Sequence, residues 1–208
     1  MIIAIDGPAG SGKGTLARRI AQHFALDYLD SGSLYRAVAA SVLVRGEDPA
    51  DRDAAIRAAR ELDLNQVDAA ELRSRRVGSA ASIVAVIPEV RQALIDFQRA
   101  FARRGAVIDG RDIATVVAPE AEVKLYITAS LDERARRRTA ELAALGRASD
   151  AAAIRTDLAE RDRRDTERAH APLKMADDAL LLDTTDLDIE AAFQAALSLI
   201  ERRLDTTG

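Results

Sequence analysis

The residues with the clearest chemical potential form one glycine-rich segment, Gly7-Pro8-Ala9-Gly10-Ser11-Gly12-Lys13-Gly14-Thr15. Glycines let the backbone turn its N–H groups inward around a phosphate, at the positive end of the helix expected next. The segment matches the pattern GxxxxGK[ST] at Gly7, Gly12 and Lys13, but its hydroxyl comes one residue late, on Thr15. The pattern predicts a loop that binds nucleotide phosphates; the alternative is a glycine-rich turn that binds nothing.

A second feature is an uninterrupted polar run, Glu160-Arg161-Asp162-Arg163-Arg164-Asp165-Thr166-Glu167-Arg168. On a helix, Arg163 points away from the face shared by Arg161, Arg164, Asp165 and Arg168. Such a run is either a solvated helix with internal ion pairs or a charged wall that faces an anionic cleft. Beside a phosphate loop, we favour the charged wall.

A carboxylate that could serve a metal is Asp109, which ends an apolar run before Gly110-Arg111-Asp112. At the end of a strand it could hold a water bound to Mg²⁺ beside nucleotide phosphates. The alternative is a turn-forming Asp-Gly pair. We predict a magnesium site from Asp109 and the hydroxyl of Thr15.

The catalytic residue types that the sequence lacks restrict the class of reaction further. Both histidines, His23 and His170, lie outside the loops that end predicted strands, and no Ser-His-Asp spacing or metal-ligand cluster occurs. A sugar kinase needs a base, whereas an acceptor phosphate, with a second pKa of about 6, is already anionic at neutral pH. It needs cations instead, and arginines supply them. The sequence therefore predicts phosphate-to-phosphate transfer, and the lack of an Asn-Lys-x-Asp element argues against a GTP switch.

The composition limits the partners and the cellular location that can be expected. The 208 residues contain no cysteine, carry a net charge of −4 and are 3% aromatic. This argues against disulfides, duplex binding and base-stacking platforms, so no nucleic-acid partner is expected. No apolar run approaches the ~18 residues of a membrane span, and residues 2–5 enter a predicted strand at once, with no charged n-region or cleavage site before it, so we expect an uncleaved protein. We expect a cytoplasmic protein without a membrane partner.

Apolar runs predict five strands, at 2–5, 27–29, 106–109, 123–127 and 179–182. Their alternation with helical patterns predicts an α/β fold with a doubly wound, five-stranded parallel sheet, which binds ligands at the carboxyl ends of its strands.

Helix starts can also be predicted. The hydroxyls of the Asp30-Ser31-Gly32-Ser33 turn are expected to cap a helix that opens at Leu34, and Asp48-Pro49 to start another. Pro88 begins a helix with a predicted buried stripe of Val90, Leu94, Phe97 and Phe101. Between these helices, Asp63 to Gly78 has no clear period and is interpreted as a partly solvated insertion.

Four segments together resemble the bacterial cytidylate kinases, within the nucleoside monophosphate kinases of the P-loop type, along nearly the whole chain. They are the phosphate loop with glycine after its lysine, Asp30-Ser31-Gly32-Ser33-Leu34-Tyr35-Arg36, Gly110-Arg111-Asp112, and the polar run continued through Ala169-His170-Ala171-Pro172-Leu173. The resemblance implies one kinase domain over 1–208, with a core (1–30, 83–145, 169–208), an acceptor-binding subdomain (about 31–82) and a lid (about 146–168). Both the insertion and the lid are shorter than the family usually carries.

The resemblance also assigns residues. It implies that 7–15 hold the ATP phosphates and that Lys13, Arg161 and Arg164 are catalytic. It implies that the CMP-binding residues are Ser31, Arg36 and Arg111 for the phosphate, Ser82, Arg91 and Asp112 for the base, Arg161 and Asp165 for the sugar, and Arg168 near the acceptor. A carboxylate suits the exocyclic amine of cytosine, which uracil lacks.

The implied activity is ATP-dependent phosphorylation of CMP and dCMP, with Mg²⁺, by a monomer. Two alternatives stay open. One is a kinase for UMP or AMP, and the other is a non-catalytic nucleotide-binding module whose arginine-rich helix docks a protein partner.

Overall fold

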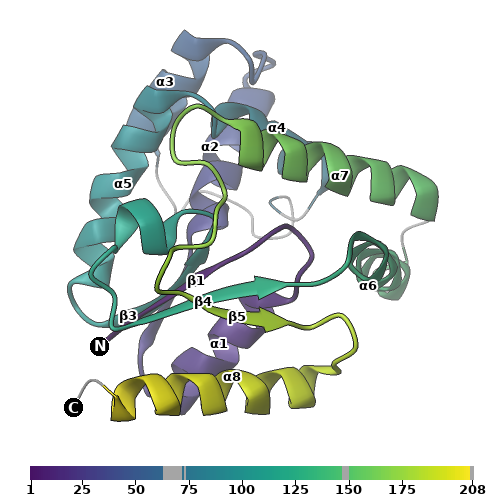
Figure 1. The fold of residues 1–208 in the computed structure, drawn as a ribbon. Coiled ribbons are helices and arrows are strands. Elements are labelled where there is room, and N and C mark those ends of the chain that lie inside the picture. Colours follow the sequence, from purple (N-terminus) through teal and green to yellow (C-terminus); the bar gives the residue numbers. More distant parts are fainter. Residues whose placement is uncertain (63–71, 73, 147–149, 207–208) are drawn as a thin grey trace.

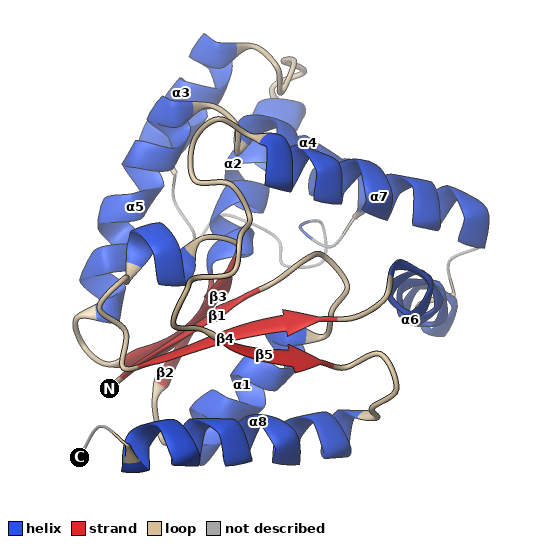
Figure 2. Cartoon of the chain, in the orientation of Figure 1, coloured by secondary structure: helices blue, strands red, loops and turns tan. Residues whose placement is uncertain are grey.

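The computed structural model describes residues 1–62, 72, 74–146 and 150–206. Five strands form one parallel sheet in the order β2-β3-β1-β4-β5 (Figures 1 and 2). The strands are β1 (Ile2–Asp6), β2 (Asp27–Asp30), β3 (Ala106–Gly110), β4 (Val123–Thr128) and β5 (Leu180–Asp183). The predicted parallel sheet is confirmed. Because β1 is its central strand, the loop after β1 opens in the middle of the carboxyl edge.

Helices cover both faces of the sheet and extend beyond it (Figure 1). They are α1 (Lys13–His23), α2 (Ser31–Val44), α3 (Arg52–Arg60), α4 (Arg75–Val84), α5 (Pro88–Ala102), the π-helix η3 (Ile113–Val117), α6 (Leu131–Ala144), α7 (Ala151–Glu167) and α8 (Ile189–Asp205). Helices α1 and α8 bury one sheet face around Ile3, Ile5 and Leu125. The other face packs Ala4 and Ile108 against η3 and the end of α5.

A separate core joins α2, α3, α4 and α5. Many of its buried residues are alanines, such as Ala39, Ala54, Ala58 and Ala81, and small side chains let helix backbones approach closely. This compact group of helices carries one wall of the site described below. Among the described residues, no helix combines the length and apolarity that crossing a bilayer would require.

Two predicted helix starts are wrong by a few residues. The helix expected from Leu34 begins at Ser31, and its cap is the carboxylate of Asp30, which accepts a hydrogen bond from the Ser33 N–H at 3.1 Å. The predicted hydroxyl cap is wrong because the Ser33 hydroxyl instead donates to the Asp30 carbonyl, at 2.6 Å. The helix expected at Asp48-Pro49 begins at Arg52, because Asp51 accepts from the first-turn N–H groups.

The predicted stripe of α5 is also partly wrong. Val90 and Leu94 are buried, but Phe97 is 45% exposed. The buried face is rotated toward Arg91 and Gln98, which are both almost fully buried. A pattern based on apolar residues alone cannot find a helix face that buries a guanidinium.

The expected insertion between Asp63 and Gly78 lies mostly outside the described residues. Its last part is helical, because α4 begins at Arg75. The Ser74 hydroxyl caps this helix by accepting from the Val77 N–H at 3.2 Å. The expected partly solvated insertion is therefore helical from Arg75 onward.

Candidate active site

The phosphate loop joins β1 to α1 and depends on glycine at several positions. Gly7 has φ +153°, and a Cβ there would collide with the backbone carbonyl oxygen of Ile127. Gly12 has φ +84° and is the N-cap of α1, without a side chain to satisfy the first N–H groups of the helix. These groups are therefore available to an anion.

Lys13 is buried in the loop, where its Nζ lies 3.4 Å from the carbonyl oxygen of Pro8. Burial and the nearby Arg111 lower the pKa of Lys13 to about 7, although Asp109 and Asp30 favour the charged form. A bound phosphate would add negative charge at this position. The ammonium form would then be favoured at physiological pH.

Beside the loop lies a cavity of about 190 Å³ at the carboxyl ends of β2 and β3, called the acceptor cavity below because residues expected to bind the acceptor line it. It brings together eight of the nine predicted CMP-binding residues: Ser31, Arg36, Ser82, Arg111, Asp112, Arg161, Asp165 and Arg168. Lys13 and Asp109 also line it. The ninth, Arg91, lies behind the cavity wall and contacts it through Asp112.

Asp112 is held from two sides. It forms ion pairs with Arg91 and, at 3.3 Å, with Arg168, and all three side chains are buried. The Arg91 guanidinium also lies 5.6 Å from the centre of the Tyr35 ring. The carboxylate orientation is therefore fixed before a ligand binds.

Two further arginines of the cavity are also paired with carboxylates. Arg111 contacts Asp165 at 2.9 Å, and Arg36 contacts Asp30 at 2.5 Å. Although burial raises it, the neighbouring Arg111 and Arg161 hold the pKa of Asp165 below its usual range. These pairs keep the guanidinium groups at the cavity wall.

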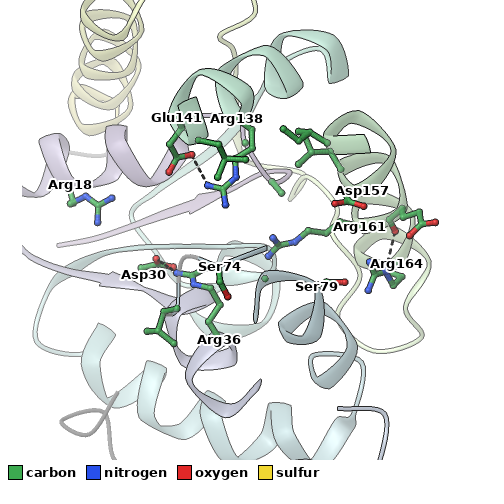
Figure 3. Close-up of a pocket in the computed structure, with 18 residues that line it drawn as sticks. Arg18, Asp30, Arg36, Ser74, Ser79, Arg138, Glu141, Asp157, Arg161 and Arg164 are labelled. Atoms are coloured by element: carbon green, nitrogen blue, oxygen red, sulfur yellow. Dashed lines mark hydrogen bonds and ion pairs between the residues drawn. The ribbon is translucent and has the colours of Figure 1, made fainter. Parts of the chain in front are cut away.

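Arg161 differs from these arginines. Within the described part of the chain it forms no ion pair, and its buried Nε has no hydrogen-bond partner. Burial and the nearby Arg111 lower its pKa to about 10. From α7, Arg161 points toward the space beside Arg36 and Asp30 (Figure 3). A partially desolvated guanidinium in that position favours an anionic ligand.

Arg164 does not line the acceptor cavity. It borders an adjoining cavity of about 400 Å³ between the loop, α4, α6 and α7, which Arg36 and Arg161 also line (Figure 3). Its Nε donates to the carbonyl of Glu160 at 3.4 Å. Arg163 is exposed, as predicted from the helical face.

The two predicted magnesium ligands line different cavities. Asp109 is buried in the acceptor cavity, where it accepts a hydrogen bond from the Tyr28 hydroxyl at 2.7 Å. Thr15 is exposed and lines a different cavity, of about 480 Å³. The carboxylate residue next to Asp109 is Asp30, its neighbour in the parallel pairing of β2 with β3. Burial and the charge of Asp30 raise the pKa of Asp109.

This arrangement is compatible with Mg²⁺. The described residues contain no group of three or more metal-binding side chains, but Mg²⁺ commonly keeps several waters and uses one or two carboxylates together with substrate phosphates. Asp109 and Asp30 are oxygen ligands of that kind, next to Lys13.

Sequence reasoning missed Arg134 on α6. Its guanidinium donates to the carbonyl of Ala9 in the phosphate loop at 3.0 Å, and contacts Asp162 of α7 at 2.7 Å. It is 5% exposed, so it connects the loop to the helix that carries Arg161. The arginine-rich sequence of α6 resembles an ordinary solvated face, and only the packing of α7 identifies the buried member.

A phosphate loop at the centre of a parallel sheet, with a cationic cavity beside it, defines the class of P-loop phosphotransferases. The cytidylate kinase family model matches residues 3–202. The chain therefore belongs to the cytidylate kinase family.

Curated relatives agree over nearly the full length. The chain is 59% identical to the cytidylate kinase of Methylocella silvestris, covering 99% of this chain and 96% of the relative. It is 58% identical to that of Cereibacter sphaeroides (97% and 95% covered) and 54% identical to that of Azorhizobium caulinodans (97% and 98% covered). A solved uncharacterized protein from Eubacterium ventriosum has a similar fold, with a TM-score of 0.58 at 14% identity over 97% of this chain and 98% of its own.

Proposed function

We propose that this chain transfers the γ-phosphoryl group of ATP to the phosphate of CMP, forming ADP and CDP, and that dCMP is also accepted. The observation that carries the proposal is the cavity in which Lys13 of the phosphate loop faces Arg36, Arg111 and Arg161. Membership of the cytidylate kinase family supports an enzyme over a non-catalytic binding module.

Catalysis in this proposal is positioning and charge neutralisation. The phosphate of CMP attacks as an anion, so no protein base is needed. Arg36 and Arg111, together with the Ser31 hydroxyl, hold it, and Lys13 stabilises the charge on the transferring group. The backbone N–H groups of residues 7–15, other than Pro8, hold the ATP phosphates in line with the attacking oxygen.

The buried network around Asp112 selects the base. Its carboxylate accepts a hydrogen bond from the exocyclic amine of cytosine, Ser82 serves the remaining polar edge, and Arg91 contributes to base binding through its ion pair with Asp112. Uracil has a carbonyl oxygen in place of that amine, so it would face a carboxylate at that position. Arg161 and Asp165 bind the sugar, and Arg168 keeps Asp112 in place.

Mg²⁺ would bind beside these groups, held through water by Asp109 and Asp30 and by the substrate phosphates. When bound, it would neutralise negative charge on the phosphates. We assign Thr15 to the ATP side of the loop, because Thr15 and Asp109 line different cavities.

The domain division is part of the proposal. Residues of about 31–82 close over the acceptor, and those of about 146–168 act as a short lid on the core. Closure brings Arg164 to the phosphates and excludes water that would hydrolyse ATP. We expect a cytoplasmic monomer.

An acceptor panel tests this function. Equal concentrations of CMP, dCMP, UMP and AMP are supplied with ATP and Mg²⁺, and ADP release is measured for each. CMP should give the highest kcat/KM. A higher value with UMP or AMP would establish the other monophosphate kinase, and ATP binding without acceptor-dependent ADP release would establish the binding module.

Asp112→Asn tests the base reading. Loss of one good hydrogen bond to a charged group should lower the ratio of kcat/KM for CMP to that for UMP at least about tenfold. Asp178→Asn is the matched control, since Asp178 pairs with Lys124 away from the acceptor cavity. An unchanged ratio in Asp112→Asn would show that another group reads the base.

A further inference from the structure

Asp6 is a buried carboxylate that the mechanism above leaves without a role. It is the last residue of β1, directly before Gly7, and is 2% exposed. It lines none of the three cavities described above. Its two oxygens accept hydrogen bonds from the N–H groups of Ile113 and Ala114, at 2.9 and 2.8 Å. The carboxylate thus connects the strand before the phosphate loop to a segment distant in sequence.

Those two N–H groups begin the π-helix η3, immediately after Arg111 and Asp112. The first N–H groups of a helix lack partners within it, and an aspartate at the N-cap position usually supplies one. Asp112 occupies the N-cap position of η3 but makes no capping hydrogen bond. Asp6 supplies the cap from another element. The carboxylate of Asp112 is consequently available to Arg91, Arg168 and the acceptor cavity.

The segment is also fixed on its other side. A Cβ at Gly110 would collide with the hydroxyl of Ser31 and crowd the side chain of Ile113. In the sheet register, Gly110 lies beside Asp6. The backbone from Gly110 to Ala114 is therefore held between α2 and the end of β1.

Placing a carboxyl group at this buried position costs desolvation free energy. Burial raises the pKa of Asp6 to about 7, although the two N–H groups act in the opposite direction. Arg111 and Asp112 face it from the same segment, and their charges act on Asp6 in opposite directions. A neutral residue would avoid the desolvation of a carboxylate, so its presence here is consistent with a functional requirement.

We propose that Asp6 is a positioning residue for acceptor recognition: by capping η3 it fixes the backbone that directs Arg111 and Asp112 into the acceptor cavity. This inference rests on the proposed function, in which those two residues bind the phosphate and the base. Asp6 itself does not touch the nucleotide. Its effect should fall on the acceptor, even though the adjacent residue, Gly7, belongs to the ATP loop.

The test is Asp6→Asn, which keeps the size of the side chain but replaces one accepting oxygen with an NH₂ group facing a backbone N–H. KM for CMP should rise about tenfold or more, and the preference for CMP over UMP should fall, because an unpaired buried donor displaces the segment. The affinity for ATP should change less than about threefold. Asp178→Asn should leave all of these values near those of the wild type.

A double-mutant cycle shows whether Asp6 acts through Asp112. The loss of base preference in Asp6→Asn combined with Asp112→Asn should be clearly less than the product of the two single losses. Multiplicative losses, unchanged acceptor KM, or equal losses of ATP and CMP affinity would overturn the proposal.

Folding is checked by thermal unfolding of the intact chain and by ATP binding. If Asp6→Asn does not fold, Asp6→Ser provides a second variant, because it retains one accepting oxygen without a charge. Failure of both to fold would also overturn the proposal, since Asp6 would then support the sheet. The wild-type preference for CMP is measured first in the same assay, so failure of the proposed function is recognised separately.

Discussion

The phosphate loop and the acceptor cavity are neighbours, but they are built in different ways. The loop consists of consecutive residues and depends on backbone torsions, with positive φ at Gly7, Gly10 and Gly12. The cavity depends on side chains from distant parts of the chain, joined by ion pairs such as Arg111–Asp165 and Arg168–Asp112. The comparison indicates that the donor side is specified locally, whereas the acceptor side requires the whole fold.

The difference should appear in how each region responds to substitution. In the loop, adding a single carbon should be harmful wherever the backbone is crowded. In the cavity, the loss of a charge should matter more than a change of shape. Three predictions test this division.

The largest effect should come from removing a cation at the junction of the two regions. Lys13→Ala and Arg36→Ala should each lower kcat by about 100- to 1000-fold, because preorganised charge near the reacting phosphates is lost. Steady-state kinetics and thermal unfolding measure activity and folding. The exposed Lys174→Ala and Arg45→Ala are the matched controls, and near-normal rates in the two site variants would contradict the mechanism.

A smaller effect on stability should distinguish a glycine with close neighbours from a glycine without them. Gly7→Ala should reduce stability by about 2 kcal/mol or more and raise KM for ATP, because the new Cβ meets the Ile127 carbonyl. Gly46→Ala is the control: Gly46 has φ +71° with no neighbour within 4 Å. It should lose only about 1 kcal/mol, from strain, with normal ATP binding. Denaturant unfolding compares the two, and equal losses would show that crowding in the loop is unimportant.

The smallest expected effect is the uptake of a proton by Lys13 when ATP binds. Burial lowers the pKa of Lys13 to about 7, so its amine is mostly neutral in the free enzyme at pH 8. Phosphates favour the ammonium form, so ATP binding at pH 8 should take up as much as about one proton. Calorimetry in buffers of different ionisation enthalpy measures it. Lys13→Ala should lack this uptake, and identical uptake in both proteins would rule out Lys13 as its source.

The difference between the locally specified loop and the cavity that requires the whole fold also explains which features could be predicted from the sequence. The loop and the five strands follow from local patterns, and the sheet brought the ends of β2 and β3 together as expected. Ser82 and Arg91 came only from the family resemblance, because a small residue and an arginine on a helix carry no local signal. Their positions depend on how α4 and α5 pack.

Other features could not be predicted because they depend on tertiary contacts. Tyr28, Arg134 and Asp6 act on groups far along the chain, at Asp109, Ala9 and Ile113. The Asp30 cap was missed because both carboxylates and hydroxyls can cap a helix, and only geometry decides between them. The exposed Phe97 reflects a helix face used to bury Arg91.

The pairing of arginines with aspartates has a consequence for selectivity in the cell. Arg36, Arg111 and Arg168 already have carboxylate partners, so much of the positive charge at the cavity wall is compensated before a ligand binds. A small anion such as inorganic phosphate must compete with these internal partners and brings no base or sugar contacts of its own. A complete nucleotide adds base and sugar contacts, so we expect free anions to inhibit the enzyme only weakly.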